Sequence, residues 1–466
     1  MKPFLRKQII VLVLLFCILI LFTSCQKAKQ NEKLRVLIDL DYDNYHDGNY
    51  RESLNRDLLF CFQYPCGLDT EKIQIEFLPT TESERNVKIQ ALKTEIMAGG
   101  GPDVFLLSCS VPGWKSNRYY GKYLGKNYDN PERLFPDVQA AMKNGIFLAL
   151  DDYLSSAEWL DTDMLLSPAR NAGVAENKLM IVPIALTFPV AIYAESAVEN
   201  LPGSWSEAFA QQNVAVRSAY GAAAYQQFPD LFGQVADYEK NTLTVSKESL
   251  YQIVKESLAM EDKNLLKGVK NGAAFSQEEY GGFRSVHSLD YLQMVRWEQG
   301  YYDGFWEEKG FPQCVAPIYN TEGGVTAEIT VYAGINRNTK YPETAFRILD
   351  YFSSVNAQAA RGDIDKEGYT HQTFFAHGFY GVPARNDLMR NIEYSFGQYS
   401  IREAGDELFS EYTALRNEVT HARFYGTLDQ ELQTMYEACL EAESDEEIEK
   451  IVSKAYDTML MILAES

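Results

Sequence analysis

Strand and helix patterns alternate between Leu34 and Leu107, and this alternation restricts the fold more than any other feature of the chain. The runs Leu34–Ile38 and Asp103–Leu107 are almost continuously apolar, which is typical of strands buried on both faces. Lys72–Phe77 alternates apolar and polar residues, whereas Ser83–Ala98 repeats apolar residues at helical spacing. This order of elements predicts an α/β fold in which a mostly parallel sheet has helices on both faces.

The length and charge of the chain exclude several classes of protein. The chain has 466 residues, which favours two or three domains. Lys and Arg total 43 against 65 Asp and Glu, giving a formal charge of -22. Such an acidic surface repels phosphate backbones and anionic lipid headgroups, so we expect no nucleic-acid partner. Any attachment to a membrane must depend on something other than charge.

The first 25 residues supply a means of attachment. A basic start, with Lys2, Arg6 and Lys7, precedes an apolar run that ends at Phe22 and is too short to span about 30 Å of hydrocarbon. The small residues before Cys25 resemble the lipobox of bacterial lipoproteins, although Phe22 stands where an aliphatic residue is usual. Residues 1–24 are therefore expected to be a lipoprotein signal peptide, Cys25 the lipidated residue and 25–33 a tether. The alternatives are an ordinary signal peptide cut nearby or a retained anchor.

The cysteines and histidines give no sign of a metal or cofactor site. The spacing of Cys61 and Cys66 allows a disulfide that closes a small loop, and the other cysteines are expected to be buried. The five histidines are scattered without the spacing of metal ligands. Neither a nucleophile elbow nor a phosphate-binding loop occurs, because the glycine run at 99–101 precedes a strand rather than a helix. We expect no cofactor and no metal.

A series of motifs resembles family 1 extracellular solute-binding proteins, the receptors of ABC sugar importers. The run Leu92–Val104, with its three glycines followed by Pro102 and Asp103, is similar to the signature of that family. Seven other segments are similar to family motifs and follow in the same order: Asn144–Leu154, Lys178–Pro183, Leu201–Glu207, Asn271–Phe275, Val315–Pro317, Ala333–Ile335 and Tyr380–Pro383. The residue before the second of them, Asn177, stands where the family motif usually has glycine.

The resemblance implies a two-lobed fold of the periplasmic-binding-protein type II, with the ligand in the cleft between two α/β lobes. The chain is expected to cross between the lobes near 149–153, 314–318 and 381–384. Lobe one would then comprise 34–150 and 319–381, and lobe two 151–313 and 384–466.

The loops that follow two of the expected strands carry candidate ligand contacts. In open parallel sheets, ligands lie beyond the carboxyl ends of the strands. Carboxylates suit sugar hydroxyls and flat aromatic rings suit sugar faces, so Asp and Trp together indicate carbohydrate. A solvated turn is the alternative for the aspartates, and core packing for Trp114. The candidates are Asp39, Asp41, Tyr42 and Asp43 after the first strand, Ser108 and Trp114 after Leu107, and Thr187, Phe188, Tyr280, Tyr319 and Asn320 by their positions in the family pattern.

The resemblance implies a binding protein rather than an enzyme. Such a receptor would capture a carbohydrate, expected to be an oligosaccharide, by closure of its lobes and deliver it to the transmembrane subunits of an ABC permease. It would act as a monomer on the outer face of the cytoplasmic membrane, which is the periplasmic side in a host with two membranes. The alternatives are the same fold with a peptide, a polyamine or another solute, and a secreted glycoside hydrolase that uses two carboxylates.

Overall fold

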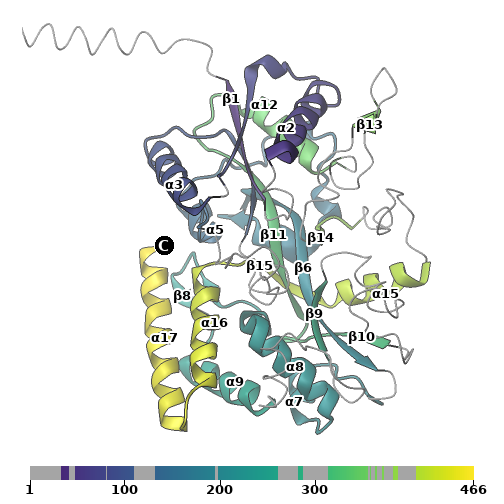
Figure 1. Cartoon of the computed structure of the whole chain (residues 1–466), viewed down its shortest axis with the longest axis vertical. Helices are drawn as coiled ribbons and strands as arrows, with labels where there is room; N and C mark the ends of the chain where they lie inside the picture. Colours follow the sequence, from purple (N-terminus) through teal and green to yellow (C-terminus); the bar gives the residue numbers. More distant parts are fainter. Residues whose placement is uncertain are drawn as a thin grey trace, which may run out of the picture.

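The computed structural model has two parts, stacked along the longest axis of the molecule (Figure 1). None of the helices in the described residues is long and apolar enough to cross a membrane. The structure describes residues 33–40, 48–79, 81–109, 132–194, 198–260, 282–286, 313–354, 357, 363–364, 370–371, 381–386 and 406–466.

A mixed sheet runs through the centre of the described structure. Its main path follows the order β10-β6-β11-β3-β1-β2. The strands β1, β2 and β3 pair in parallel, as the alternating sequence pattern predicts, whereas β6 and β11 are antiparallel to their neighbours on this path. The strands are β1 (Leu34–Asp39), β2 (Ile73–Phe77), β3 (Val104–Ser108), β6 (Ile181–Ala194), β9 (Gly282–Val286), β10 (Gln313–Pro317), β11 (Val325–Ile335), β14 (Val382–Pro383) and β15 (Val419–Phe424).

Helices and short hairpins surround this sheet. The helices are α2 (Gly48–Gln63), α3 (Glu82–Met97), α5 (Val138–Lys143), α6 (Ser167–Ala172), α7 (Trp205–Ala210), α8 (Val214–Gln227), α9 (Lys247–Met260), α12 (Pro342–Phe352), α15 (Asp406–Asn417), α16 (Thr427–Leu440) and α17 (Asp445–Glu465). The two-residue strands are β4 (Val174–Ala175), β5 (Lys178–Leu179), β7 (Ala236–Asp237), β8 (Thr242–Leu243), β12 (Asp363–Ile364) and β13 (Thr370–His371).

The upper part of the molecule, lobe one, is a sheet covered on both faces. Alternate residues of β1 enter different cores: Val36 and Ile38 pack on one side with α2 and α12, and Leu37 packs on the other side with α3 and α5. Side chains of successive residues in a strand point to opposite faces, so both faces must be apolar. The near-continuous apolar runs of β1 and β3 are therefore the consequence of a three-layer arrangement.

The lower part, lobe two, is mostly helical. Its core contains buried residues of α8, α9, α16 and α17 together with the end of β6 and of β10 (Figure 1). Helix α17 begins at Asp445, and the Ser444 hydroxyl caps it by accepting a hydrogen bond from the backbone N–H of Glu447. The carboxylate of Glu447 accepts in turn from the N–H of Glu443, the residue before the N-cap, so the side chains of Ser444 and Glu447 together hold the start of the helix.

We infer the segments that join the two lobes from the cores in which their residues pack. Strand β6 belongs to both cores near its end, because Phe188 and Val190 on one face pack in a core of lobe one and Ala191 and Tyr193 on the other face pack in the core of lobe two. A second change lies between Ile318 and Val325, beside the expected crossing at 314–318. A third lies between Phe424 and Leu428. We propose these three segments as the crossings, because Leu150, Val382 and Ala384, at the other expected crossings, pack in a core of lobe one.

The cysteines of α2 and its following turn are buried in lobe one. Cys61 and Cys66 are present as thiols, and the backbone N–H of Cys66 donates to the carbonyl of Cys61 at 3.3 Å. Burial, followed by the neighbouring charge of Cys61, raises the pKa of the Cys66 thiol. The disulfide between them stays a prediction.

Candidate functional site

The carboxyl ends of β1 and β3 lie side by side at one edge of the sheet. Asp39, the last residue of β1, is in register with Leu107 of β3, and Ser108 is in register with Val331 of β11. The chain therefore leaves β1 and β3 at neighbouring positions, as the parallel pattern predicts. This edge, beside the long strands β6 and β11, is the candidate site for a ligand.

Asp39 is the centre of a buried ion pair at this edge. Its side chain is 3% exposed, and its two carboxylate oxygens accept hydrogen bonds from Nη1 and Nη2 of Arg85 at 2.7 and 2.5 Å. Arg133 approaches the same carboxylate at 3.5 Å. A bidentate pair fixes both partners in orientation. Asp39 thus anchors the end of β1 to α3 and to the segment around Arg133, and its role in binding a ligand stays a prediction.

The other predicted residues on the strands are buried as well. Thr187 and Phe188 of β6 are each 1% exposed, and Ser108 is also buried. Thr187 faces Glu328 across the β6–β11 pair, and the ring of Phe188 lies 5.9 Å from that of Tyr412. These side chains pack inside the protein in this structure, and their contact with a ligand stays a prediction.

Tyr319 is the predicted residue that keeps an accessible position. Its backbone N–H donates to the hydroxyl of Tyr220 at 3.1 Å, and its own hydroxyl lies 3.5 Å from Glu418. Partial burial, followed by the charge of Glu418, raises its pKa. Asn320 is fully buried and closes a turn, because its amide donates to Thr326 at 2.8 Å. The remaining predicted residues lie outside the described residues: Asp41, Tyr42, Asp43, Trp114, Tyr280 and Cys25.

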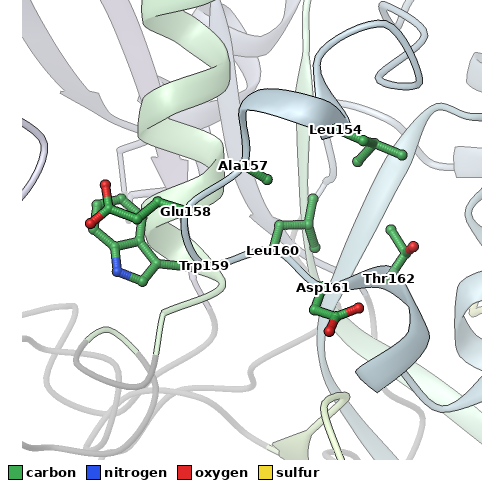
Figure 2. Close-up of a pocket in the computed structure, with 7 residues that line it drawn as sticks. All are labelled: Leu154, Ala157, Glu158, Trp159, Leu160, Asp161 and Thr162. Atoms are coloured by element: carbon green, nitrogen blue, oxygen red, sulfur yellow. The ribbon is translucent and has the colours of Figure 1, made fainter.

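A second candidate is a cavity of about 350 Å³ beside α12 (Figure 2). It contains Trp159, which is partly buried, between the acidic Glu158 and Asp161. An aromatic ring together with carboxylates is the sugar contact expected from the sequence, with Trp114 as the candidate ring. The same combination occurs at Trp159, in a segment that no strand pattern marks. The lining residues are Leu154, Ala157, Glu158, Trp159, Leu160, Asp161 and Thr162.

The loop that forms this cavity is held by a residue far away in sequence. Asp350 of α12 is buried, and its carboxylate accepts three backbone N–H groups, from Glu158 at 2.8 Å, Trp159 at 3.1 Å and Leu160 at 2.6 Å. The Arg385 guanidinium donates to the Trp159 carbonyl. Both the backbone N–H groups and the backbone carbonyl around Trp159 are therefore held by hydrogen bonds.

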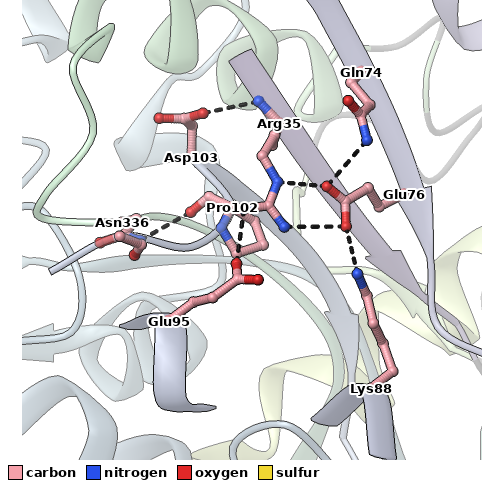
Figure 3. Close-up of polar contacts among 9 residues, drawn as sticks. Arg35, Gln74, Glu76, Lys88, Glu95, Pro102, Asp103 and Asn336 are labelled. Carbon is pink, nitrogen blue, oxygen red and sulfur yellow. Dashed lines mark hydrogen bonds and ion pairs between the residues drawn. The ribbon is translucent and has the colours of Figure 1, made fainter. Parts of the chain in front are cut away.

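The glycine-rich motif lies at the opposite edge of the sheet from the carboxyl ends of β1 and β3. The buried amide of Asn336 donates to the carbonyls of Gly100 and Pro102 at 2.8 and 2.9 Å (Figure 3). Asp103 accepts from the backbone N–H of Arg35 at 2.8 Å. Gly101 has a φ of +97°, and a Cβ there would meet Ile96 at 2.8 Å. The motif that carries the family resemblance is thus a structural turn rather than a ligand contact.

Charged side chains reinforce the same edge. Arg35 of β1 donates to Glu76 of β2 at 2.5 Å and to Glu95 of α3 at 2.8 Å, and Lys88 pairs with Glu76 at 2.9 Å (Figure 3). Within the described residues, no group of His, Cys, Asp and Glu has the arrangement of a metal site.

Comparison with known proteins identifies the fold. No family model matches the sequence, and no curated protein matches it. Many solved structures are similar to it, and three examples match over most of both chains. An extracellular solute-binding protein family 1 from Alicyclobacillus acidocaldarius is 15% identical, with a TM-score of 0.51 over 91% of this chain and 97% of that chain.

The other two similar structures are sugar-related binding proteins. A periplasmic oligogalacturonide binding protein from Yersinia enterocolitica is 13% identical, with a TM-score of 0.53 over 93% of this chain and 99% of that chain. The sugar-binding protein MalE from Xanthomonas citri is 13% identical, with a TM-score of 0.53 over 93% and 98%. Together with the two lobes and their crossing strands, these likenesses show that the chain has the two-lobed α/β fold of extracellular and periplasmic solute-binding proteins.

Proposed function

We propose that this protein is the lipid-anchored, extracellular receptor of an ABC importer and that it captures a carbohydrate by closure of its two lobes. The observation that carries the proposal is the match over nearly the whole of both chains to binding proteins for sugars and oligogalacturonide. The crossing strands support it, because a few extended segments between two packed bodies are the usual hinge of such a closure.

The membrane part of the proposal depends on the amino-terminal segment. Cleavage before Cys25 and acylation of that residue would hold an acidic protein at a surface that repels it. Delivery of the solute to the transmembrane permease subunits would then occur on the outer face of the cytoplasmic membrane. Mass spectrometry of the mature chain, with a Cys25→Ala variant as the control, tests this step: the acylated mass should be present in the wild type alone.

An oligosaccharide is the proposed cargo, with no covalent change during transport. A glycoside hydrolase needs two carboxyl groups that the substrate can reach. Asp230 and Glu328, a carboxyl pair that the structure does bring together, are both buried in the core and out of reach of a sugar. Trp159 with its flanking carboxylates is a contact suited to a sugar or to a cationic solute.

The test is thermal unfolding of the full chain in mild detergent with a panel of mono- and oligosaccharides, peptides and polyamines. A ligand at a hundred times its dissociation constant adds about 2.7 kcal/mol to the free energy of unfolding. Stabilisation by one class of sugar, recovered intact afterwards, is the expected result. Stabilisation by peptides or polyamines alone would remove the carbohydrate assignment, and breakdown of the sugar would refute the transport function.

A further inference from the structure

Four charged side chains from four different elements meet in the interior where the lobes join. Asp230 comes from the 3₁₀ helix Phe228–Leu231, Glu328 from β11, Arg423 from β15 and Asp429 from α16. Each of the four is at most 8% exposed. Arg423 donates to Asp230 at 2.9 Å and lies 3.2 Å from Asp429, which also accepts the backbone N–H of Gly426 at 2.8 Å. We call these four residues the junction cluster.

The junction cluster lies at two of the three crossings. Glu328 and Arg423 are in register on the adjacent strands β11 and β15. Glu328 lies three residues after Val325, where the second crossing ends, and Arg423 lies one residue before Phe424, where the third crossing begins. Asp230 and Asp429 belong to segments whose apolar neighbours pack in the core of lobe two. The ion pairs of Arg423 therefore connect the crossing strands to lobe two.

The cluster contains more negative groups than it can hold in ionised form. Three carboxyl groups face a single guanidinium, and neither carboxyl oxygen of Glu328 makes a hydrogen bond of good geometry with a described residue. Leaving a buried ionised carboxylate without a partner is costly, and such a group binds a proton instead. Glu328 is in register with Arg423, and Arg423 binds Asp230, so the two carboxyl groups belong to one cluster and the charge of Asp230 acts on Glu328.

Burial and mutual repulsion act in the same direction on these acids. Burial, followed by the charge of Asp230, raises the pKa of Glu328 well above its usual range. Burial raises the pKa of Asp230 to about 6 in spite of Arg423, and it also raises the pKa of Asp429. The other titratable groups that act on the cluster are Tyr425, which follows β15, and Asp137 and Tyr238, whose side chains share a hydrogen bond of 2.6 Å.

We propose that Glu328 and Asp230 share one proton in the folded protein, and that this proton holds β11 and β15 against lobe two. When the proton leaves for solvent, Glu328, Asp230 and Asp429 all face Arg423 as anions, and the junction between the lobes loosens. The strands β11 and β15 are therefore held against lobe two more firmly at low pH than at high pH. The inference requires no ligand and stands apart from the proposed cargo.

The sign of the pH dependence follows from linkage. A carboxyl group with a higher pKa in the folded than in the unfolded state makes the folded state bind more protons, so stability falls as pH rises through that interval. For Asp230 the interval runs from about 4, the usual value for the unfolded chain, to about 6. Glu328 extends the loss to higher pH because its pKa is raised further.

The decisive variant is Glu328→Gln, which mimics the protonated side chain and can donate to Asp230. The matched control is Glu248→Gln, the same change at an exposed position in the first turn of α9. Thermal unfolding of the full chain in mild detergent is measured from pH 5 to pH 8.5. The midpoint of Glu328→Gln should equal that of wild type at pH 5 and exceed it by about 2 °C or more at pH 8.5, whereas Glu248→Gln should follow wild type throughout. Parallel profiles for Glu328→Gln and wild type would overturn the proposal.

Two further measurements locate the effect and do not depend on the variant alone. Amide hydrogen exchange at pH 8.5 should be faster in wild type than in Glu328→Gln across Val325–Ile335 and Val419–Phe424, and equal in α17; faster exchange everywhere would mean a general loss of stability and would overturn the local device. If Glu328→Gln does not fold, infrared spectroscopy of the wild type decides: a protonated carboxyl band present at pH 7 and lost on titration supports the shared proton, and its absence refutes it.

Discussion

Removing the side chain of Asn336 should destabilise lobe one without touching the candidate ligand edge. The buried amide makes three hydrogen bonds, donating to the carbonyls of Gly100 and Pro102 and accepting from the N–H of Asn338 at 3.0 Å. At about 1 kcal/mol net for each, with a further cost for carbonyls left buried, Asn336→Ala should lose about 2–4 kcal/mol of the free energy of unfolding. That is a large share of the roughly 5–15 kcal/mol of a typical domain.

A second substitution and a control separate hydrogen bonding from volume. Asn336→Asp keeps the shape of the side chain but replaces both donors with a carboxylate that faces two carbonyls, so it should cost at least as much as Asn336→Ala. Asn338→Ala, an exposed change two residues further on, should cost less than about 0.5 kcal/mol.

The assay is equilibrium urea unfolding of the full chain. Circular dichroism and tryptophan fluorescence are followed together, because two lobes can unfold in separate steps. A loss for Asn336→Ala no larger than that for Asn338→Ala would refute the view that the glycine-rich motif is held as a structural turn.

Three further substitutions test the other buried polar contacts, each by its effect on the urea midpoint. Arg85→Lys loses the bidentate contact with Asp39 and should cost about 1–3 kcal/mol. Asp350→Asn replaces one acceptor oxygen with a donor that faces backbone N–H groups and should cost about 2–4 kcal/mol, and proteolysis should then cut the loop around Trp159 faster. Tyr238→Phe removes the hydrogen bond to Asp137 and should cost about 1 kcal/mol.

The chain offers a matched exposed change for each of these variants: Arg56→Lys, Asp152→Asn and Tyr64→Phe. Each control should shift the midpoint by no more than an ordinary surface substitution, within about 0.5 kcal/mol. A buried variant that behaves like its control would show that the contact contributes nothing to stability.

Local sequence patterns were enough to predict several strands and helices of lobe one. The strands that begin at Leu34 and Val104 and the helix α3 follow directly from such patterns. Pro183 and Pro189 both lie within strand β6, although proline is unfavourable inside a sheet. Tertiary pairing with β11, β9 and β10 outweighs the local signal of proline there.

The contacts that define the candidate sites could not be read from the sequence, because they join residues that are far apart in the chain. Asp39 was predicted as a ligand contact, but no pattern in the sequence around it identifies Arg85 or Arg133 as its ion-pair partners. Likewise, Trp159 depends on Asp350, 191 residues away. The burial of Thr187 and Phe188 likewise depends on packing that no local pattern encodes.

The order of strands in the sheet has a consequence for how the chain reaches its folded state. Strand β3 lies between β1, which precedes it by some 70 residues, and β11, which follows by more than 200, and β11 in turn pairs with β15 near the end of the chain. Contacts so distant in sequence are slow to form, since a long loop must close before they stabilise anything. A chain that emerges from its amino terminus therefore cannot complete the sheet of lobe one until the last tenth of the sequence is available.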